Sequence, residues 1–76
     1  MYVYITVPYG VFCPWPTWVI ESYDLWTIGD LRDDICIELS LDNSSYKICK
    51  NNVDCDSTHL VEDDFNEDDT VQLVEV

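Results

Sequence analysis

Hydrophobic and polar residues alternate along the first segment of the chain. Between residues 2 and 7 the aliphatic residues are Val3, Ile5 and Val7, with Tyr or Thr at the positions between them. Because successive side chains of a strand point to opposite sides of a sheet, this alternation predicts a half-buried β-strand. A turn is then expected at Pro8–Gly10.

A second extended run spans residues 11–21 and contains two prolines. Pro14 and Pro16 are separated by one residue, so both remove a hydrogen-bond donor from the same side of a strand. A strand of this kind pairs on one side only. The run therefore predicts an edge strand next to the first strand.

Between residues 28 and 39 the hydrophobic period changes to three or four residues, as in an amphipathic helix. Thr27 can cap this helix, and Asp30 stands at the third helical position, where a carboxylate meets the positive end of the helix dipole. We expect a helix from Ile28 to Leu39. Its apolar face comprises Ile28, Leu31, Ile35 and Leu39.

The rest of the chain predicts short strands separated by turns and loops. Residues 46–50 (YKICK) predict a third strand, followed by two asparagines that favour a turn. Residues 53–60 are irregular and leave room for a brief fourth strand. The polar segment 60–69 predicts a loop anchored by Leu60 and Phe65.

The last predicted strand spans residues 70–74. Val71 and Leu73 lie on one of its faces. The opposite face carries Thr70, Gln72 and Val74. A chain of 76 residues holds one core at most, so we expect a single α+β domain over residues 1–76. The expected core is Val3, Ile5, Trp18 or Ile20, Ile28, Leu31, Ile35, Leu60, Phe65, Val71 and Leu73.

Sixteen acidic residues against three basic ones give a formal net charge of −13. An apolar content of 47% nevertheless predicts a folded chain. The negative field disfavours direct contact with nucleic acid or an anionic membrane and favours basic partners. No apolar run reaches the ~18 residues of a membrane span, and the N-terminus lacks the basic lead of a signal peptide. We expect an intracellular location, cytoplasmic or nuclear.

Four cysteines allow three pairings into two disulfides. Without an export signal we expect reduced thiols. Cys49 and Cys55 are close enough in sequence to leave one local disulfide open.

The order of the predicted elements resembles the β-grasp, and two segments resemble ubiquitin and its relatives. TIGDLRDDI resembles the start of the family's helix, a Thr-Ile pair followed by apolar residues three and seven places after the Ile, here Leu31 and Ile35. HLVEDDFNEDDTVQLV resembles the family's last third, with Leu60, Phe65 and the closing strand at matching spacing. The resemblance implies a ubiquitin-like β-grasp roll, with one helix packed on a mixed sheet of four to five strands. The proline-containing hairpin and residues 40–58 depart from the family's pattern.

Conjugated members of this family carry a flexible tail that ends in Gly-Gly, whereas this sequence ends at Val76. The resemblance therefore implies a divergent, non-conjugated ubiquitin-like protein or a module cut from a longer one. For the sequence as given we expect no activation as a modifier.

The resemblance also implies a recognition surface, an apolar patch on the outer face of the sheet. Val74 takes the apolar place on the last strand, Gln72 takes the polar place beside it, and Ile48 is the candidate from the third strand. In the alternative register of YKICK, Ile48 lies in the core and Lys47 lies outside. The sequence leaves both registers open.

Three tryptophans are too many for so small a core. In strand alternation Trp15 lies opposite Trp18, so one of them is expected to face solvent, where a large aromatic ring is a typical binding anchor. We identify Trp15 as a candidate protein-binding residue. The alternative is that the prolines and the long loop cover both rings.

Two acidic runs form a candidate surface that comprises Glu62, Asp63, Asp64, Glu67, Asp68 and Asp69. Such a run predicts a solvated face or an imitation of a phosphate row. A calcium loop is disfavoured because Asp69 stands where the loop requires Gly.

Sequence support for catalysis or metal binding is weak. His59 with Cys49 and Cys55 offers at most three zinc ligands, at unfamiliar spacing. No Gly-rich phosphate loop or other nucleophile and base pair occurs. We therefore expect neither an enzyme nor a cofactor.

Two functions agree with this sequence. The first is a non-catalytic interaction module whose outer sheet face binds a protein with an apolar or basic surface, such as a receptor or ligase of the ubiquitin pathway. The alternative is an acidic nucleic-acid mimic, an electrostatic decoy that blocks a basic site on another protein.

Overall fold

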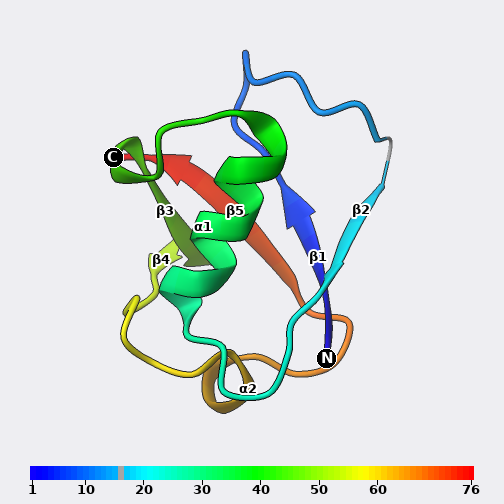
Figure 1. The fold of residues 1–76 in the computed structure, drawn as a ribbon, viewed down its shortest axis with the longest axis vertical. Coiled ribbons are helices and arrows are strands. Elements are labelled where there is room, and N and C mark those ends of the chain that lie inside the picture. The colour runs from blue at the N-terminus through cyan, green and yellow to red at the C-terminus, as the bar shows by residue number, and fades with distance from the viewer. Residues whose placement is uncertain (16) are drawn as a thin grey trace.

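The computed structural model describes residues 1–15 and 17–76 (Figure 1). In chain order the elements are β1 (Tyr2–Thr6), β2 (Trp18–Glu21), α1 (Ile28–Leu39), the 3₁₀ turn η1 (Asn43–Ser45), β3 (Tyr46–Lys50), β4 (Val53–Asp54), α2 (Val61–Asp64) and β5 (Thr70–Glu75). The predicted helix and third strand have these bounds, and the predicted last strand extends to Glu75.

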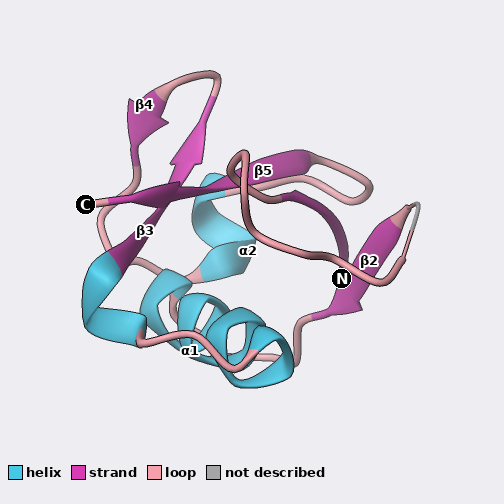
Figure 2. Ribbon diagram, turned by 90° about the horizontal axis from the view of Figure 1, so that it is seen from above, coloured by secondary structure: helices cyan, strands magenta, loops and turns pink. Residues whose placement is uncertain are grey.

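The strands form one mixed, five-stranded sheet in the order β2-β1-β5-β3-β4. β5 runs parallel to β1 and antiparallel to β3, so the first and last strands of the chain lie side by side in the middle of the sheet. Figure 2 shows α1 packed against one face of this sheet. The prediction of one main helix on a mixed sheet of four to five strands is confirmed.

Both ends of α1 are closed by local hydrogen bonds. The Thr27 hydroxyl accepts from the Asp30 N–H at 3.1 Å, and the Asp30 carboxylate accepts from the Thr27 N–H at 3.0 Å. This capping box satisfies donors that a helix start leaves free. At the other end, Ser40 adopts a left-handed conformation (φ 57°) and its N–H donates to the last turn. None of the described helices has the length and apolar character that crossing a bilayer requires.

The core between α1 and the sheet contains the predicted residues with one exception, and it includes both Trp18 and Ile20. The exception is Leu60, which is only half-buried, whereas the side chain of Val61 is 1% exposed. Val61 and Phe65 are four positions apart. Because residues 61–64 form a helical turn, the two side chains point to the same side. The loop anchored by Leu60 is therefore a wrong prediction, and the burial of Phe65 is confirmed.

The strand predicted over residues 11–21 is shorter in the structure. β2 begins at Trp18, and Pro14 lies at an exposed bend before it. The predicted effect of two prolines on one side of the strand involves Pro16, which lies outside the described residues. The position is confirmed, since β2 forms one edge of the sheet and pairs with β1.

The β3–β4 hairpin separates Cys49 from Cys55. Cys49 lies opposite Asp54, and the Cys55 N–H donates to the Ile48 carbonyl, which places Cys55 opposite Ile48. Neighbouring positions of a strand point to opposite faces, so the two thiols lie on opposite sides of the hairpin. Both are free thiols, and the local disulfide left open by the sequence does not form.

Val61→Ala is expected to lower the free energy of unfolding by about 2 kcal/mol, because it removes two buried methyl groups and leaves a cavity. Val53→Ala is the matched control, since Val53 is 67% exposed on β4. Its expected effect is within about 0.5 kcal/mol. Urea unfolding followed by circular dichroism measures both. Equal losses for the two variants would contradict the assignment of Val61 to the core.

Candidate functional site

The face of the sheet opposite α1 is built by strand alternation. Val71 and Leu73 of β5 are buried against the helix, so Gln72 and Val74 point the other way. The register of β5 with β1 and β3 extends this face on both sides. The outer face comprises Tyr2, Tyr4 and Thr6 of β1, Val19 and Glu21 of β2, Lys47 and Cys49 of β3, Asp54 of β4, and Thr70, Gln72 and Val74 of β5.

Ile48 does not belong to the outer face. Its side chain is 2% exposed and it pairs with Leu73, whose side chain is in the core. The pairing of β3 with β5 fixes the register and turns Lys47 and Cys49 outward. The prediction that Ile48 contributes to a surface patch is therefore wrong, and the alternative register is the observed one.

Lys47 and Cys49 share Asp54 as a partner. The Lys47 ammonium lies 3.0 Å from the Asp54 carboxylate, and the Cys49 thiol donates to it at 3.2 Å. The hydrogen bond from Lys47 is the main cause that lowers the pKa of Asp54. Burial raises the pKa of Cys49. This part of the outer face therefore carries a neutral ion pair beside a protonated thiol.

Gln72 supports the turn between β3 and β4. Its side-chain oxygen accepts a hydrogen bond from the Asn52 N–H at 3.2 Å. Asn51 and Asn52 both have positive φ angles, 53° and 64°, as the tight turn of a hairpin requires. Gln72 and Val74 are half-buried on the outer face, and their role in binding stays a prediction.

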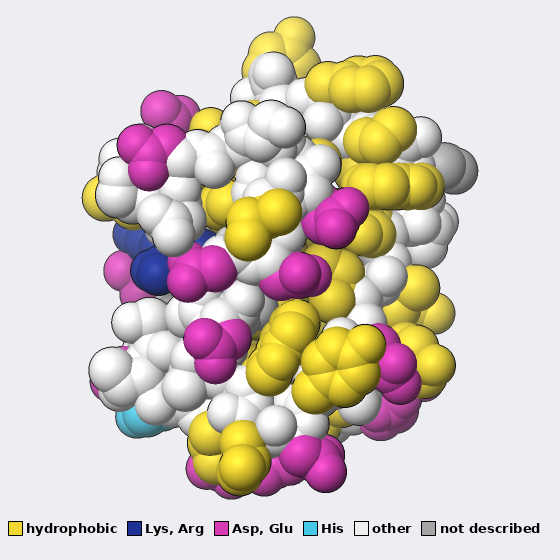
Figure 3. Space-filling view, viewed as in Figure 1, with side chains coloured by type: hydrophobic (Ala, Val, Ile, Leu, Met, Phe, Trp, Pro, Cys, Tyr) yellow, Lys and Arg dark blue, Asp and Glu magenta, His cyan; other side chains and the backbone are white. Residues whose placement is uncertain are grey.

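Few acidic residues reach the outer face. Among the described residues of the strands, alternation places only Glu21 of β2 and Asp54 of β4 on this side, and Lys47 neutralises Asp54. Figure 3 shows acidic side chains spread over the opposite, helix-covered side. The outer face is thus close to neutral in a chain of net charge −13.

Trp15 lies apart from the outer face. It is 40% exposed, and its ring stacks on that of Trp18 at 4.9 Å between centroids. Trp18 is 8% exposed and belongs to the core at the edge of the sheet. One exposed and one buried ring were predicted, but Trp15 lies in a loop rather than in a strand. The structure does not bring it together with Val74, because β1 separates β2 from β5.

The predicted acidic surface is partly tied to the protein's own groups. Asp69 accepts hydrogen bonds from Lys50 at 2.7 Å and from the Asn66 N–H at 2.8 Å. These contacts, the Asn66 bond first, lower the pKa of Asp69. Glu67 accepts from the Tyr2 N–H at 3.2 Å. Asp64 is paired with His59 at 3.0 Å. The exposed members that remain are Glu62, Asp63 and Asp68, which is a short row for an imitation of nucleic acid.

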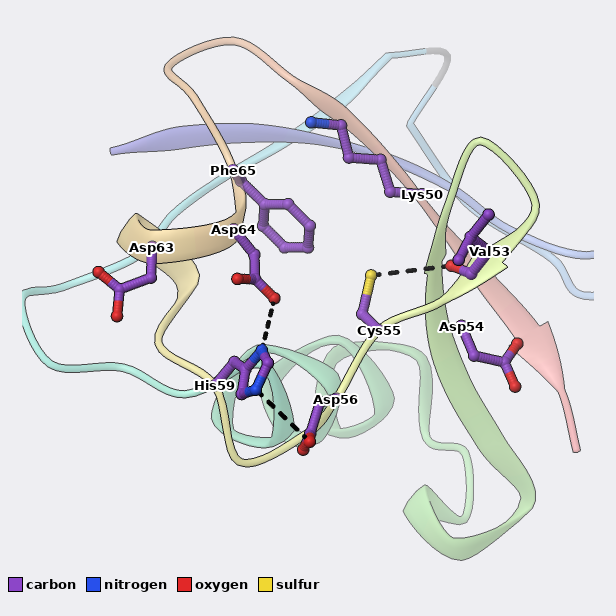
Figure 4. A pocket seen from close by; sticks show the side chains of 9 residues that line it. All are labelled: Lys50, Val53, Asp54, Cys55, Asp56, His59, Asp63, Asp64 and Phe65. Carbon is purple, nitrogen blue, oxygen red and sulfur yellow. Dashed lines mark hydrogen bonds and ion pairs between the residues drawn. The ribbon is translucent and has the colours of Figure 1, made fainter.

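His59 is held between two carboxylates at an open hollow of about 540 Å³ (Figure 4). Its Nδ1 lies 3.0 Å from Asp64, and its Nε2 lies 3.5 Å from Asp56. The hydrogen bond to Asp64, followed by the charges of Asp64 and Asp56, raises the pKa of His59. The imidazole thus links α2 to the segment that follows β4.

The same hollow contains Cys55, but the arrangement does not activate a nucleophile. Burial is the main cause that raises the pKa of the Cys55 thiol, and its hydrogen bond goes to the Val53 carbonyl at 3.9 Å. Both ring nitrogens of His59 face carboxylates instead. Within residues 1–15 and 17–76, no three His, Cys, Asp or Glu side chains are grouped so that they could hold a metal ion.

The ion pairs of His59 predict a pH-dependent stability. Because the pKa of His59 is raised in the folded state, its contribution is complete below the unfolded value of about 6.5 and is lost as pH rises through the folded value. The stability difference between the wild type and His59→Gln should therefore shrink from pH 6 to pH 8.5. Urea unfolding at several pH values measures it. A difference that grows with pH would contradict the ion pairs.

Comparison with known proteins identifies the architecture. No protein-family model matches the chain, and no curated protein matches it by sequence. A solved structure of ubiquitin from Caldiarchaeum subterraneum is similar over 100% of this chain and 92% of its own, with a TM-score of 0.79 and 16% sequence identity. At this identity the likeness concerns the fold. The chain has a ubiquitin-like β-grasp fold.

Proposed function

We propose that this chain is a non-catalytic interaction module that binds a protein partner through its outer face. The observation that carries the proposal is the low charge of this face. A chain with sixteen acidic residues keeps one broad sheet surface free of helices and nearly free of net charge. Protein interfaces are depleted of charge at their centre and more polar at the rim, which is the pattern found here.

Val74 is the expected centre of the interface. It is half-buried on β5, pairs with Lys47 on one side, and lies beyond the Gln72 that closes the β3–β4 turn. Lys47 is already paired with Asp54, so a partner need not supply a carboxylate. The partner's matching surface is expected to be apolar at its centre, with basic groups that meet the acidic residues around the face.

The module is proposed to be non-catalytic because the side chains most suited to catalysis among those described are not activated. The Cys49 and Cys55 thiols have raised pKa values, and carboxylates engage His59. The β-grasp likeness to a ubiquitin supports, as a further proposal, a partner such as a receptor or ligase of the ubiquitin pathway. A location inside the cell, in the cytoplasm or nucleus, belongs to the same proposal.

The experiment is affinity capture from an extract of the native host with immobilised chain. Val74→Asp should lower the amount of specifically retained protein at least about tenfold, because it buries a charge at the centre of the interface. Ile37→Asp is the matched control, with the same charge change on an exposed position of α1, and should retain them.

The same assay separates the electrostatic alternative. Retention through an apolar centre should survive about 300 mM salt, whereas charge mimicry should collapse over that range. A combined Glu62→Gln, Asp63→Asn and Asp68→Asn variant should keep the partner. Loss of the partner in this variant, with retention in Val74→Asp, would overturn the outer-face proposal in favour of the decoy.

A further inference from the structure

Charge is segregated along this chain. Residues 1–20 contain no Asp, Glu, Lys, Arg or His, so the formal charge of −13 lies on residues 21–76. The uncharged segment forms β1, the loop after it and most of β2, which lie together on one side of the molecule (Figure 1). Among the described residues on this side, the acidic ones are confined to Glu21 at the end of β2 and Asp24 in the loop that follows.

Exposed apolar side chains gather along the same side. Figure 3 shows hydrophobic side chains in a band over β2 and the loops that precede and follow it. The apolar band comprises Tyr9, Phe12, Trp15, Val19, Tyr23 and Leu25. Leu25 is held at a φ angle of 69°, which bulky residues rarely adopt, and its side chain is exposed. Contiguous apolar surface of this kind marks interaction sites.

The backbone of β2 offers a free edge inside this band. The observed strand begins at Trp18 and contains no proline, so the one-sided pairing predicted for residues 11–21 does not apply to it. Met1 and Ser22 exchange both of their backbone hydrogen bonds, at 3.1 and 2.8 Å. Hydrogen-bonded and non-bonded pairs alternate in an antiparallel ladder, so Trp18 and Ile20 bond to β1 whereas Val19 and Glu21 point their peptide groups outward. In the part of the chain that the structure describes, no other element pairs with these outward groups.

We propose that this side binds a second copy of the chain, with the two β2 strands paired antiparallel about a twofold axis through Val19. In that register each Val19 faces Val19 of the other copy, and Glu21 faces the uncharged Thr17. The two Glu21 residues are then four positions apart, or about 13 Å, which exceeds the screening length of about 8 Å at physiological salt. The edge is therefore self-complementary in hydrogen bonding without opposing like charges.

The proposed strand pairing forms a dimer and does not extend to further copies. The pairing occupies the free edge of β2. The other edge of the sheet is β4, which has two residues and carries Asp54. Short edges with a charged side chain resist further pairing. Because the remaining acidic residues repel one another, dimerisation should strengthen as salt is added, opposite to the binding of a basic partner.

The test is sedimentation equilibrium of residues 1–76 in about 20 mM and about 300 mM NaCl. The expected mass changes from that of the 8.9 kDa monomer toward twice that value as salt rises. A monomer at both salt concentrations, up to several hundred micromolar protein, would overturn the proposal. Species larger than the dimer would overturn the closed geometry.

Paired variants locate the interface. Val19→Glu places like charges opposite each other and should raise the dimer dissociation constant at least about tenfold. Val53→Glu adds the same charge at an exposed position of β4 and should change it less than about threefold. Equal effects of the two variants would show that net charge alone governs association and would overturn the β2 interface. Circular dichroism confirms that each variant is folded.

Amide hydrogen exchange of the wild type provides a readout that needs no variant. The Val19 and Glu21 N–H groups point to solvent in the monomer and should become protected in the dimer, while the Asp54 N–H should be unchanged. Dimerisation without this protection would overturn strand pairing as its mode. Val74→Asp should leave the dimer intact, so failure of the outer-face proposal and failure of this one are distinguishable.

Discussion

The parallel pairing of β1 with β5 is the constraint on which the rest of the structure depends. It places Ile5 beside Val71 and joins strands from the two ends of the chain, with backbone hydrogen bonds such as that from the Tyr4 N–H to the Asp69 carbonyl, 65 positions apart. Bringing such distant segments together costs chain entropy, which burial of their aliphatic side chains under α1 must offset. Once β5 is in place, β3 pairs on its other side, and the inner and outer faces of every strand are determined.

Acidic residues are distributed unevenly around this frame. The acidic turn before β5 is bonded to β1 through the Asp68 N–H and the Asp69 carbonyl, and Lys50 neutralises the Asp69 side chain. Acidic residues elsewhere lie mainly on the helices and the loops, whereas the sheet keeps a nearly neutral outer face and a β1–β2 side on which Glu21 is the one acidic residue of the two strands. A very acidic chain thus retains two surfaces on which apolar contact is electrostatically tolerable.

The sequence was most informative where the signal is local. The bounds of α1 follow from a 3.6-residue period and a cap in which Thr27 and Asp30 bond each other, and no distant partner is needed for either. The orientation of Ile48 was not predictable, because YKICK contains no strict alternation and its register depends on β5. Val61 was missed for a related reason. A four-residue helix is too short to show a hydrophobic period in the sequence, and its presence makes Val61 the buried residue instead of Leu60. Of the candidate site, Val74 and Gln72 were placed on the correct face by alternation alone.

The register between β3 and β5 is the most direct test, since it decides which residues form the outer face. The Val76 N–H donates to the Ser45 carbonyl, so alternation makes Ile48 and Leu73 a non-hydrogen-bonded pair with α-carbons about 4.5 Å apart. A nuclear Overhauser spectrum of the labelled protein should therefore contain a strong contact between the α-protons of Ile48 and Leu73. A corresponding contact of Leu73 with Lys47 or Cys49 would mean a shift by one residue, would turn Ile48 outward, and would contradict the outer face described here.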